Sequence, residues 1–257
     1  MPSPIRYAVI LAAGQGIRLG ECGLNGPKAL LTVGGRTLLS RSLELLAAAG
    51  ITRVLLVTGY KAEAFEKGLE APRGLVVEKL PNPDFKDHGS LLSLVVGLRR
   101  VREPCLILDG DILYEPLALR TALDHRAENV MVLSSPSGSG DEYYAWTDGQ
   151  SRLLFQSKDA GAMAQAPVGE SVGILKCGTA LRGAILAKAE AMLQNAVSAD
   201  YEWAVCAAGR SHPIICARAE GLLWAEVDNE TMLAHAREVI YPRIAAAEAR
   251  VSGLLPA

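Results

Sequence analysis

The chain has 257 residues, 50% of them hydrophobic, which is enough material to bury a sizeable core. Its formal net charge is −2 and its isoelectric point lies near 6.1, with lysine and arginine scattered along the chain. This balance argues against nucleic acid as the main ligand.

The apolar runs and the cysteines indicate where in the cell the protein is expected. The first apolar run, residues 7–13, is too short to cross a membrane, and no later stretch is both long and uncharged enough. The cysteines are odd in number and show no C-x-x-C spacing, which disfavours disulfides and metal clusters. They are Cys22, Cys105, Cys177, Cys206 and Cys216. We therefore expect a soluble, cytoplasmic protein with buried, reduced thiols and no membrane partner.

Strand and helix patterns alternate along the first half of the chain. Strands are expected at residues 7–13, 53–58, 75–78 and 105–108. Helices are expected at residues 37–49, 61–68 and 90–101, and Gly50 is typical of a helix end. Such alternation is typical of α/β units with parallel strands.

The second half has a more mixed pattern. Strands are expected at residues 129–134, 143–146, 153–156, 172–176, 212–216 and 223–227. Asp148 and Gly149 form a hairpin-turn signal between two of these strands. Helices are expected at residues 178–193, 200–208 and 229–239, with Asn229 able to cap the last one. Because no linker or repeat interrupts the chain, we expect one domain, residues 1–257, on one mostly parallel, mixed sheet.

The connection after the first strand is the most informative segment. It contains two glycines in a run of small residues, Leu11, Ala12, Ala13, Gly14, Gln15 and Gly16. A small-residue turn after a strand lets backbone N–H groups approach phosphates closely. Arg18 and Lys28 add two cations to the same connection, and this combination suits a triphosphate whose charge must be neutralised.

Other interpretations of this connection remain open from the residues alone. A dinucleotide-binding loop would place its third glycine one position before Gly20 and an acid at the end of the second strand, where this chain has Thr58, Gly59 and Tyr60. A P-loop would contain G-K-[ST], which is absent. A purely structural connection with surface cations is the remaining alternative.

The pattern L-A-A-G-x-G-x-R-[LM] followed by P-K-x-L resembles the signature of nucleotidyltransferases that activate sugar phosphates and choline phosphate. Residues 11–19 and 27–30 match it fully. The resemblance implies a Rossmann-like three-layer α/β/α sandwich. It also implies that residues 11–16 wrap the nucleotide and that Arg18 and Lys28 are catalytic cations that contact its phosphates.

Acidic residues at two strand ends suggest a metal site. Asp109 and Asp111 follow an apolar strand, and the carboxyl ends of parallel strands are where open α/β sheets bind ligands. Asp111 could hold Mg²⁺, although a turn with two solvated acids has the same pattern. The resemblance assigns Asp111 and Asp228 to the metal and Asp109 to support of the nucleotide, while Asp228 alone could equally initiate a helix.

Four segments of the second half, residues 141–144, 156–158, 200–203 and 226–228, are similar in order and spacing to those of choline-phosphate and phosphonate cytidylyltransferases. This resemblance assigns Lys158 to the acceptor's phosphate or phosphonate, as a point charge, although a solvated lysine is the alternative. Tyr143 and Tyr201 match aromatic positions around a quaternary ammonium, and core or rim packing is their alternative. Glu142 and Glu202 could pair with an amine. The segment containing Pro81, Gly89 and Ser90 matches the part that contacts the base and ribose.

The sequence therefore predicts an Mg²⁺-dependent cytidylyltransferase with a nucleotide-binding half, residues 1–128, and an acceptor-binding half, residues 129–257. It would move CMP from CTP to a small phosphonate or phosphomonoester of the 2-aminoethylphosphonate, phosphonoformate or phosphocholine type, and release pyrophosphate. The alternatives are a sugar- or polyol-phosphate nucleotidyltransferase and a catalytically inactive nucleotide-binding regulator. A homodimer is compatible with the sequence.

Overall fold

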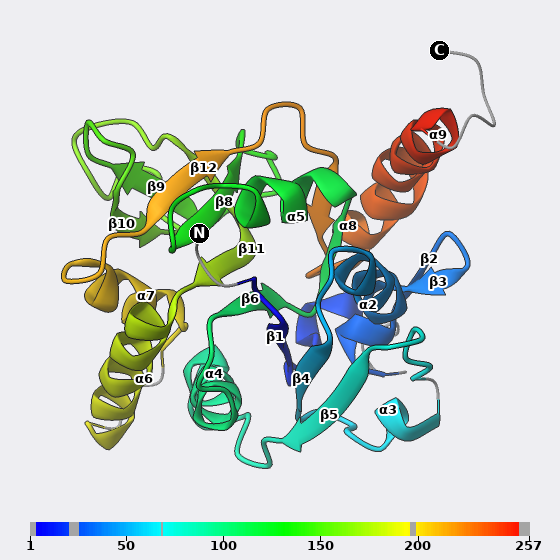
Figure 1. Ribbon diagram of the computed structural model, residues 1–257. Helices are drawn as coiled ribbons and strands as arrows, with labels where there is room; N and C mark the ends of the chain where they lie inside the picture. Colours follow the sequence, from blue (N-terminus) through cyan, green and yellow to red (C-terminus); the bar gives the residue numbers. More distant parts are fainter. Residues whose placement is uncertain (1–3, 21–25, 68, 196–198, 252–257) are drawn as a thin grey trace.

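The computed structural model describes residues 4–20, 26–67, 69–195 and 199–251. Its first half contributes four parallel strands to the central sheet (Figure 1): β1 (Tyr7–Ala12), β4 (Arg53–Thr58), β5 (Val76–Pro81) and β6 (Cys105–Asp109). β1 is apolar throughout because a parallel strand is covered on both faces. Its register pairs Leu11 with Asp109 of β6, so the glycine connection and the first acid leave the same edge of the sheet.

The second half of the chain extends the same sheet. Its strands are β8 (Val130–Ser134), β9 (Tyr144–Thr147), β10 (Leu153–Ser157), β11 (Gly169–Cys177) and β12 (Ile215–Arg218). The nine strands follow the order β10-β9-β11-β6-β1-β4-β5, and β8 pairs with both β11 and β12. β10 and β11 run opposite to the rest of the sheet. The expected mostly parallel, mixed sheet is confirmed.

Helices cover both faces of this sheet (Figure 1). One apolar core lies between the sheet and α4 (Gly89–Arg100), α6 (Thr179–Gln194) and α7 (Glu202–Gly209). The other lies between the sheet and α2 (Leu38–Ala48) and α5 (Pro116–Leu123). The structure is therefore the three-layer α/β/α sandwich that the resemblance implied.

A third apolar cluster lies beside the carboxyl edge of the sheet. There β7 (Ile112–Tyr114) and β13 (Trp224–Glu226) form a separate antiparallel ladder. The helical run α8 (Glu230–His235), η3 (Ala236–Ile240) and α9 (Tyr241–Val251) packs on it, and α9 extends away from the body of the molecule (Figure 1). Leu19, at the end of the glycine connection, is fully buried in this cluster.

The structure differs from the predicted elements in several places, among them the unpredicted hairpin of β2 (Thr32–Val33) and β3 (Arg36–Thr37). No element was predicted between Asp111 and Asn129, where β7 and α5 lie. The helix predicted at residues 61–68 shortens to α3 (Ala64–Lys67), and Gly68 lies outside the described residues. The final helix was predicted to end at Val239 but continues through Pro242. The π-helical turn η3 directly precedes this proline, and its wider winding accommodates a ring that an α-helix would clash with.

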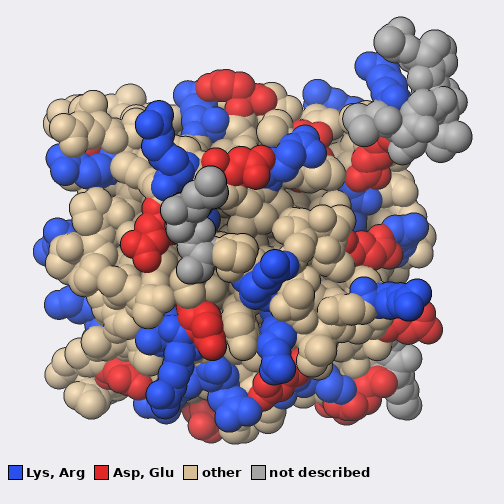
Figure 2. All heavy atoms as spheres, viewed as in Figure 1, with Lys and Arg blue, Asp and Glu red and all other residues tan. Residues whose placement is uncertain are grey.

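Several composition-based expectations can be placed on the structure. Cys105, Cys177 and Cys216 are buried free thiols and Cys206 is a half-buried one, while Cys22 lies outside the described residues. None of the described helices is both long enough and apolar enough to cross a bilayer. On the face drawn in Figure 2, acidic and basic side chains are interspersed, so its described part carries no extended field of one sign.

Candidate active site

The side chain of Lys28 passes directly over Gly16 of the glycine connection. Gly16 adopts a φ of +61°, and a Cβ there would lie 2.9 Å from Cγ of Lys28. A glycine is therefore needed both for the left-handed backbone and for the passage of this side chain. Lys28 begins the short 3₁₀ helix η2 (Lys28–Leu30), and its Nζ donates to Asp111 Oδ2 at 2.9 Å and to Asp228 Oδ1.

The turn that carries Asp111 packs directly against the end of β1. The N–H of Gly110 donates to the carbonyl of Leu11 at 2.9 Å, and a Cβ on Gly110 would lie 2.7 Å from that same oxygen. Only glycine allows this close approach, so the acidic turn and the glycine connection are fixed to each other.

A short ladder brings the second group of acids to Asp111. Glu226 of β13 pairs with Ile112 of β7, and the N–H of Val227 donates to the carbonyl of Asp111 at 3.0 Å. The carboxylate oxygens of Asp111, Glu226 and Asp228 consequently all lie within 4.8 Å of one another. Asn229 then caps α8 as predicted, because its side chain accepts from the N–H of Met232.

The charges of this acidic group depend on its burial and on Lys28. Burial, and then the charge of Asp111, raises the pKa of Glu226 well above its ordinary value. Burial lowers the pKa of Lys28, but the charges of Asp111 and Asp228 outweigh this effect and hold that pKa above its ordinary value. Lys28 is therefore a permanent cation among acids that repel one another.

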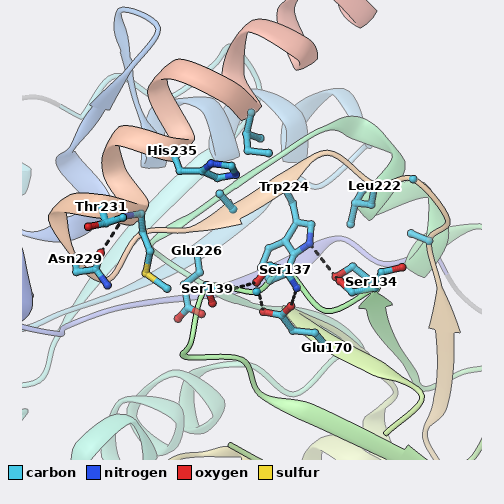
Figure 3. A pocket seen from close by; sticks show the side chains of 17 residues that line it. Ser134, Ser137, Ser139, Glu170, Leu222, Trp224, Glu226, Asn229, Thr231 and His235 are labelled. Atoms are coloured by element: carbon cyan, nitrogen blue, oxygen red, sulfur yellow. Dashed lines mark hydrogen bonds between the residues drawn. The ribbon is translucent and has the colours of Figure 1, made fainter. Parts of the chain in front are cut away.

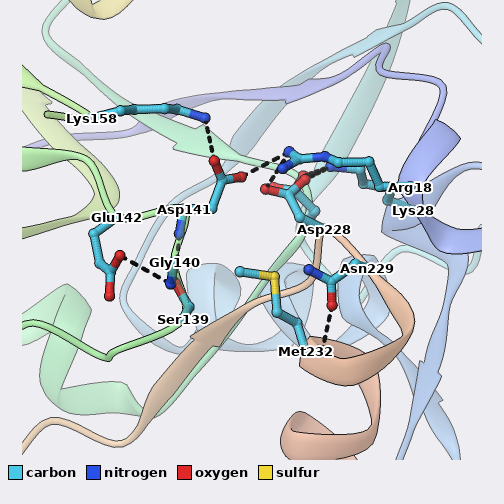
Figure 4. A network of polar contacts seen from close by, with 11 residues as sticks. Arg18, Lys28, Ser139, Gly140, Asp141, Glu142, Lys158, Asp228, Asn229 and Met232 are labelled. Carbon is cyan, nitrogen blue, oxygen red and sulfur yellow. Dashed lines mark hydrogen bonds and ion pairs between the residues drawn. The ribbon is translucent and has the colours of Figure 1, made fainter.

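Ion contacts continue from this group towards the second half of the chain (Figure 4). Arg18 Nη2 lies 3.2 Å from Asp228 Oδ2 and donates to Asp141 Oδ2 at 2.7 Å. The other oxygen of Asp141 accepts from Lys158 Nζ at 2.8 Å. Burial opposes ionisation of Asp141, but its hydrogen bonds, including those from Arg18 and Lys158, hold its pKa well below the usual range. Cations and carboxylates thus alternate from Lys158 to Asp111.

These groups open into one cavity of about 620 Å³ at the carboxyl edge of the sheet. This volume lies in the range of small-ligand sites. Four cations and six acids line it beside the glycine connection, and such a combination of charges is suited to an anionic ligand and a bound cation.

Residues 8–242 match the MobA-like NTP transferase domain. The chain belongs to this family. A CMP-5'-(3-aminopropyl)phosphonate synthase from Streptomyces rubellomurinus is 37% identical over 118 residues, which is 45% of this chain and 18% of that protein. A bifunctional IPC transferase and DIPP synthase from Rubrobacter xylanophilus is 36% identical over 117 residues, 45% of this chain and 26% of that protein. The match thus spans only a small part of each curated relative.

Solved structures of NTP transferases share the fold over almost the whole chain. The CTP:phosphocholine cytidylyltransferase from Streptococcus pneumoniae aligns with a TM-score of 0.71 at 19% identity, over 91% of this chain and 99% of that one. The inositol-1-phosphate CTP transferase from T. maritima aligns with a TM-score of 0.69 at 17% identity, over 93% of this chain and 99% of that one. The likeness extends beyond the nucleotide half, so the α/β/α fold of the complete NTP transferase domain is common to these proteins.

Most residues that the sequence assigned to the NTP transferase site line the cavity. They are Leu11, Ala13, Gly14, Gln15, Gly16, Arg18, Lys28, Gly89, Ser90, Asp109, Asp111, Tyr143, Lys158, Tyr201, Glu202 and Asp228. Their separate assignments to nucleotide, acceptor and metal stay predictions.

Three assigned residues are not brought to the cavity. The side chain of Ala12 packs in the core beneath α2, because alternate residues of a strand face opposite sides. Pro81 is exposed at the end of β5. Glu142 is buried outside the cavity and accepts from the N–H of Gly140 at 3.1 Å (Figure 4).

Other residues of the site were not assigned from the sequence. Ile17, Phe85, Lys86, Ser93, Asp200 and Glu226 line the cavity, and Asp141 joins two of its cations. A local signal existed for Glu226, because residues two apart in a strand share a face and Asp228 was already assigned. Asp141 gave no comparable signal, because its partner Arg18 lies 123 residues away in the chain.

Contacts between helices shape the part of the cavity that contains Asp109. The hydroxyl of Tyr201 donates to Asp109 Oδ2 at 3.0 Å, and the hydroxyl oxygen of Ser90 accepts from the N–H of Tyr201 at 2.9 Å. Burial, and then the charge of Asp111, raises the pKa of Asp109 to about 8, while the bond from Tyr201 opposes this. Tyr201 therefore joins the start of α7 to α4 and to the acidic turn.

One further acid that lines the cavity, Glu202, feels the charge of Lys158. The Oε2 atom of Glu202 is buried and has no hydrogen-bond partner among the described residues. Burial, and then the charge of Asp109, raises the pKa of Glu202 well above its ordinary value. Nearby, Lys158 Nζ lies 5.7 Å from the centre of the Tyr143 ring. A ligand with an anionic end and a cationic end would find a complementary group for each.

Proposed function

We propose that this NTP transferase moves CMP from CTP to a small phosphonate or phosphorylated amino-alcohol and releases pyrophosphate. The observation that carries the proposal is the convergence of Arg18, Lys28 and Lys158 with three carboxylates on the cavity beside the glycine loop. Two anionic substrates repel each other, and cations on both sides of the reacting phosphorus reduce this repulsion.

On the donor side, the backbone N–H groups of residues 14–16 would bind the triphosphate of CTP. Lys28 and Arg18 lie beside this loop and would neutralise its charge. Negative charge grows on the leaving pyrophosphate during transfer, so these contacts strengthen as the reaction proceeds.

The acidic group fits a hard divalent cation such as Mg²⁺. Asp111, Glu226 and Asp228 offer carboxylate oxygens within 4.8 Å of one another, and oxygen is the ligand that Mg²⁺ prefers. The mutual repulsion that raises the pKa of Glu226 would be relieved by such an ion. A bound ion would supply positive charge to the α-phosphate and to the attacking oxygen.

On the acceptor side, Lys158 would hold the phosphonate or phosphate, and Glu202 would pair with an amine at the other end. The unpartnered Oε2 atom of Glu202 supports an amine-bearing acceptor over a neutral polyol, because a buried carboxylate is stabilised by a cation. The name of the relative from Streptomyces rubellomurinus contains an aminopropylphosphonate, which has both end groups.

The choice of CTP is supported by relatives rather than by a contact to the base. Three of the similar proteins carry CMP or CTP in their names. In the proposed reaction an oxygen of the acceptor attacks the α-phosphorus of CTP. One new P–O bond forms, the bond between the α-phosphorus and the bridging oxygen breaks, and that oxygen leaves with pyrophosphate.

The test measures pyrophosphate release with CTP, UTP, ATP and GTP at equal concentration. Each nucleotide is combined with 2-aminoethylphosphonate, 3-aminopropylphosphonate, phosphonoformate, phosphocholine or inositol 1-phosphate, with and without Mg²⁺. We expect turnover with CTP and an amine-bearing acceptor. A preference for another nucleotide would overturn the assignment of CTP as the donor. A preference for inositol 1-phosphate would overturn the proposed class of acceptor. If no pair of substrates gives turnover, the proposed enzymatic activity is wrong.

A further inference from the structure

The loop between β8 and β9 carries an acid, Asp141, whose carboxylate forms ion pairs with two cations of the proposed site. One carboxylate, that of Asp141, accepts from Arg18 at 2.7 Å through one oxygen and from Lys158 at 2.8 Å through the other (Figure 4). Only 13% of the Asp141 side chain is exposed, whereas Arg18 and Lys158 keep 56% and 47% of theirs exposed. The acid is covered, and both cations remain accessible to an incoming ligand.

A carboxylate that places one oxygen on each of two cations resembles a phosphonate bound between them. Both groups are small, anionic and able to accept from two donors at once. In the proposed function Arg18 binds the phosphates of the nucleotide and Lys158 binds the acceptor. Asp141 and the substrates therefore require the same donors.

Two glycines lie in the segment that carries Asp141, next to open space. Gly138 and Gly140 adopt φ values of +75° and +83°, and a Cβ at either would meet open space. At the other end of the segment, Glu170 is buried and accepts from the N–H of Ser137 at 2.6 Å and from its hydroxyl at 3.1 Å. The segment is thus fixed at Ser137 and at Tyr143, whose carbonyl accepts from the N–H of Ser171 at 2.8 Å, and Asp141 contacts the two cations between these points.

Free volume lies behind the loop. A second cavity of about 580 Å³ is lined by Ser137, Gly138 and Ser139 on one side and by Trp224 on another (Figure 3). The indole N–H of Trp224 donates to the hydroxyl of Ser134 at 2.9 Å, which holds that wall in place. Gly138 and Ser139 therefore border open space, and a shift of the segment into it has to break the contacts of Asp141 with Arg18, Lys158 and Asp228.

We propose that Asp141 is a specificity-determining residue: it neutralises Arg18 and Lys158 until a substrate anion displaces it. A free anion such as inorganic phosphate must compete with Asp141 without help from other contacts. An acceptor or nucleotide makes further contacts in the cavity, and these contacts allow it to displace Asp141 from the two cations. The inference rests on the proposed function, because that function assigns these two cations to substrates.

The test compares anion binding to the full chain and to Asp141→Asn, which keeps the side chain's size but removes its charge. Calorimetry without nucleotide measures the Kd of methylphosphonate and of inorganic phosphate. We expect both to bind roughly 5- to 10-fold more tightly to Asp141→Asn, since two partly exposed ion contacts no longer compete. Asp148→Asn is the matched control, because Asp148 pairs with Arg152 on the hairpin, outside the cavity.

Kinetics provide a second readout. With the preferred acceptor, Asp141→Asn should lower the acceptor KM and increase inhibition by inorganic phosphate, a change that a merely structural role would not produce. Asp141→Ser also removes the charge and replaces Asp141→Asn if the latter fails to fold. In the double variant Asp141→Asn, Lys158→Met, most of the increase in anion affinity should be lost. Unchanged or weaker phosphonate binding in a folded Asp141 variant overturns the inference.

The two proposals fail in distinguishable ways. Tighter phosphonate binding without any CMP transfer would support displacement of Asp141 and reject the proposed enzyme. CMP transfer without tighter phosphonate binding in the variant would support the enzyme and reject the role of Asp141.

Discussion

Replacing Lys28 with methionine should destabilise the protein more in the absence of divalent ions than in their presence. The ammonium of Lys28 lies between Asp111 and Asp228, and methionine fills a similar volume without the charge. Removing one partner of a buried ion pair costs about 3–5 kcal/mol. Because Lys28 and Asp111 keep 16% and 19% of their side chains exposed, the lower end, about 3 kcal/mol, applies.

For a chain of this length, each kcal/mol lowers Tm by about 2–4 °C, so the expected loss is about 6–12 °C. The loss should grow between pH 5 and pH 8. Removing the cation raises the folded-state pKa of the neighbouring acids, and a raised acid pKa destabilises the folded protein as pH increases. Millimolar Mg²⁺ should recover part of the loss, because an ion that binds the folded state stabilises it.

The assay is thermal unfolding followed by circular dichroism, in EDTA and in Mg²⁺, at pH 5 and pH 8. Lys188→Met is the matched control, because Lys188 is an exposed residue of α6 that does not line the cavity. An equal Tm loss in both variants, or a loss in Lys28→Met that is independent of pH and Mg²⁺, would refute the reasoning about the acidic group.

Three further outcomes are expected. Asp111→Asn should lower kcat on the order of 10²-fold or more, because it removes a charged ligand but keeps its size, and its Tm loss should be smaller than that of Lys28→Met, because Asp228 still pairs with Lys28. Near wild-type turnover in Mg²⁺ would exclude the metal role. Lys158→Ala should raise the acceptor KM and leave the affinity for CTP, measured by calorimetry, nearly unchanged. Weaker CTP binding with an unchanged acceptor KM would show that Lys158 does not bind the acceptor. Burial raises the pKa of Glu170 to about 7, from an ordinary value of 4.5, so its stabilising effect is complete below pH 4.5 and lost as pH rises through 7. The Tm of the wild type should therefore fall more between pH 5 and pH 8 than that of Glu170→Gln, and parallel curves would contradict this.

Local signals allowed much of the fold and site to be predicted. The glycine connection, the apolar strands and the acids at their ends lie within short segments, and their meeting at one edge of the sheet follows from strand direction. Pro116 at the start of α5 was an available signal for a helix that the sequence analysis left unassigned. The last helix was predicted to end at Val239, and the π-turn η3 through which it continues to Pro242 is not visible in the hydrophobic pattern.

What the sequence could not reveal depends on contacts between distant segments. Glu142 and Tyr143 are neighbours in the chain, and only the register of β9 decides which of the two faces the cavity. The contact of Asp141 with Arg18 depends on how the second half of the chain returns over the glycine loop. Such a contact has no counterpart in local spacing.

The ladder of β7 and β13 has a consequence for how the protein is made. Lys28 and Asp228 are separated by 200 residues. A chain emerges from the ribosome at about 5–20 residues per second, so roughly 10 s or more separate the appearance of these two side chains. Until then β7 has no partner strand, and Asp111 lacks the acids that β13 brings beside it. The acidic group of Asp111, Glu226 and Asp228 therefore cannot assemble until β13 has been synthesised, long after the glycine connection has left the ribosome.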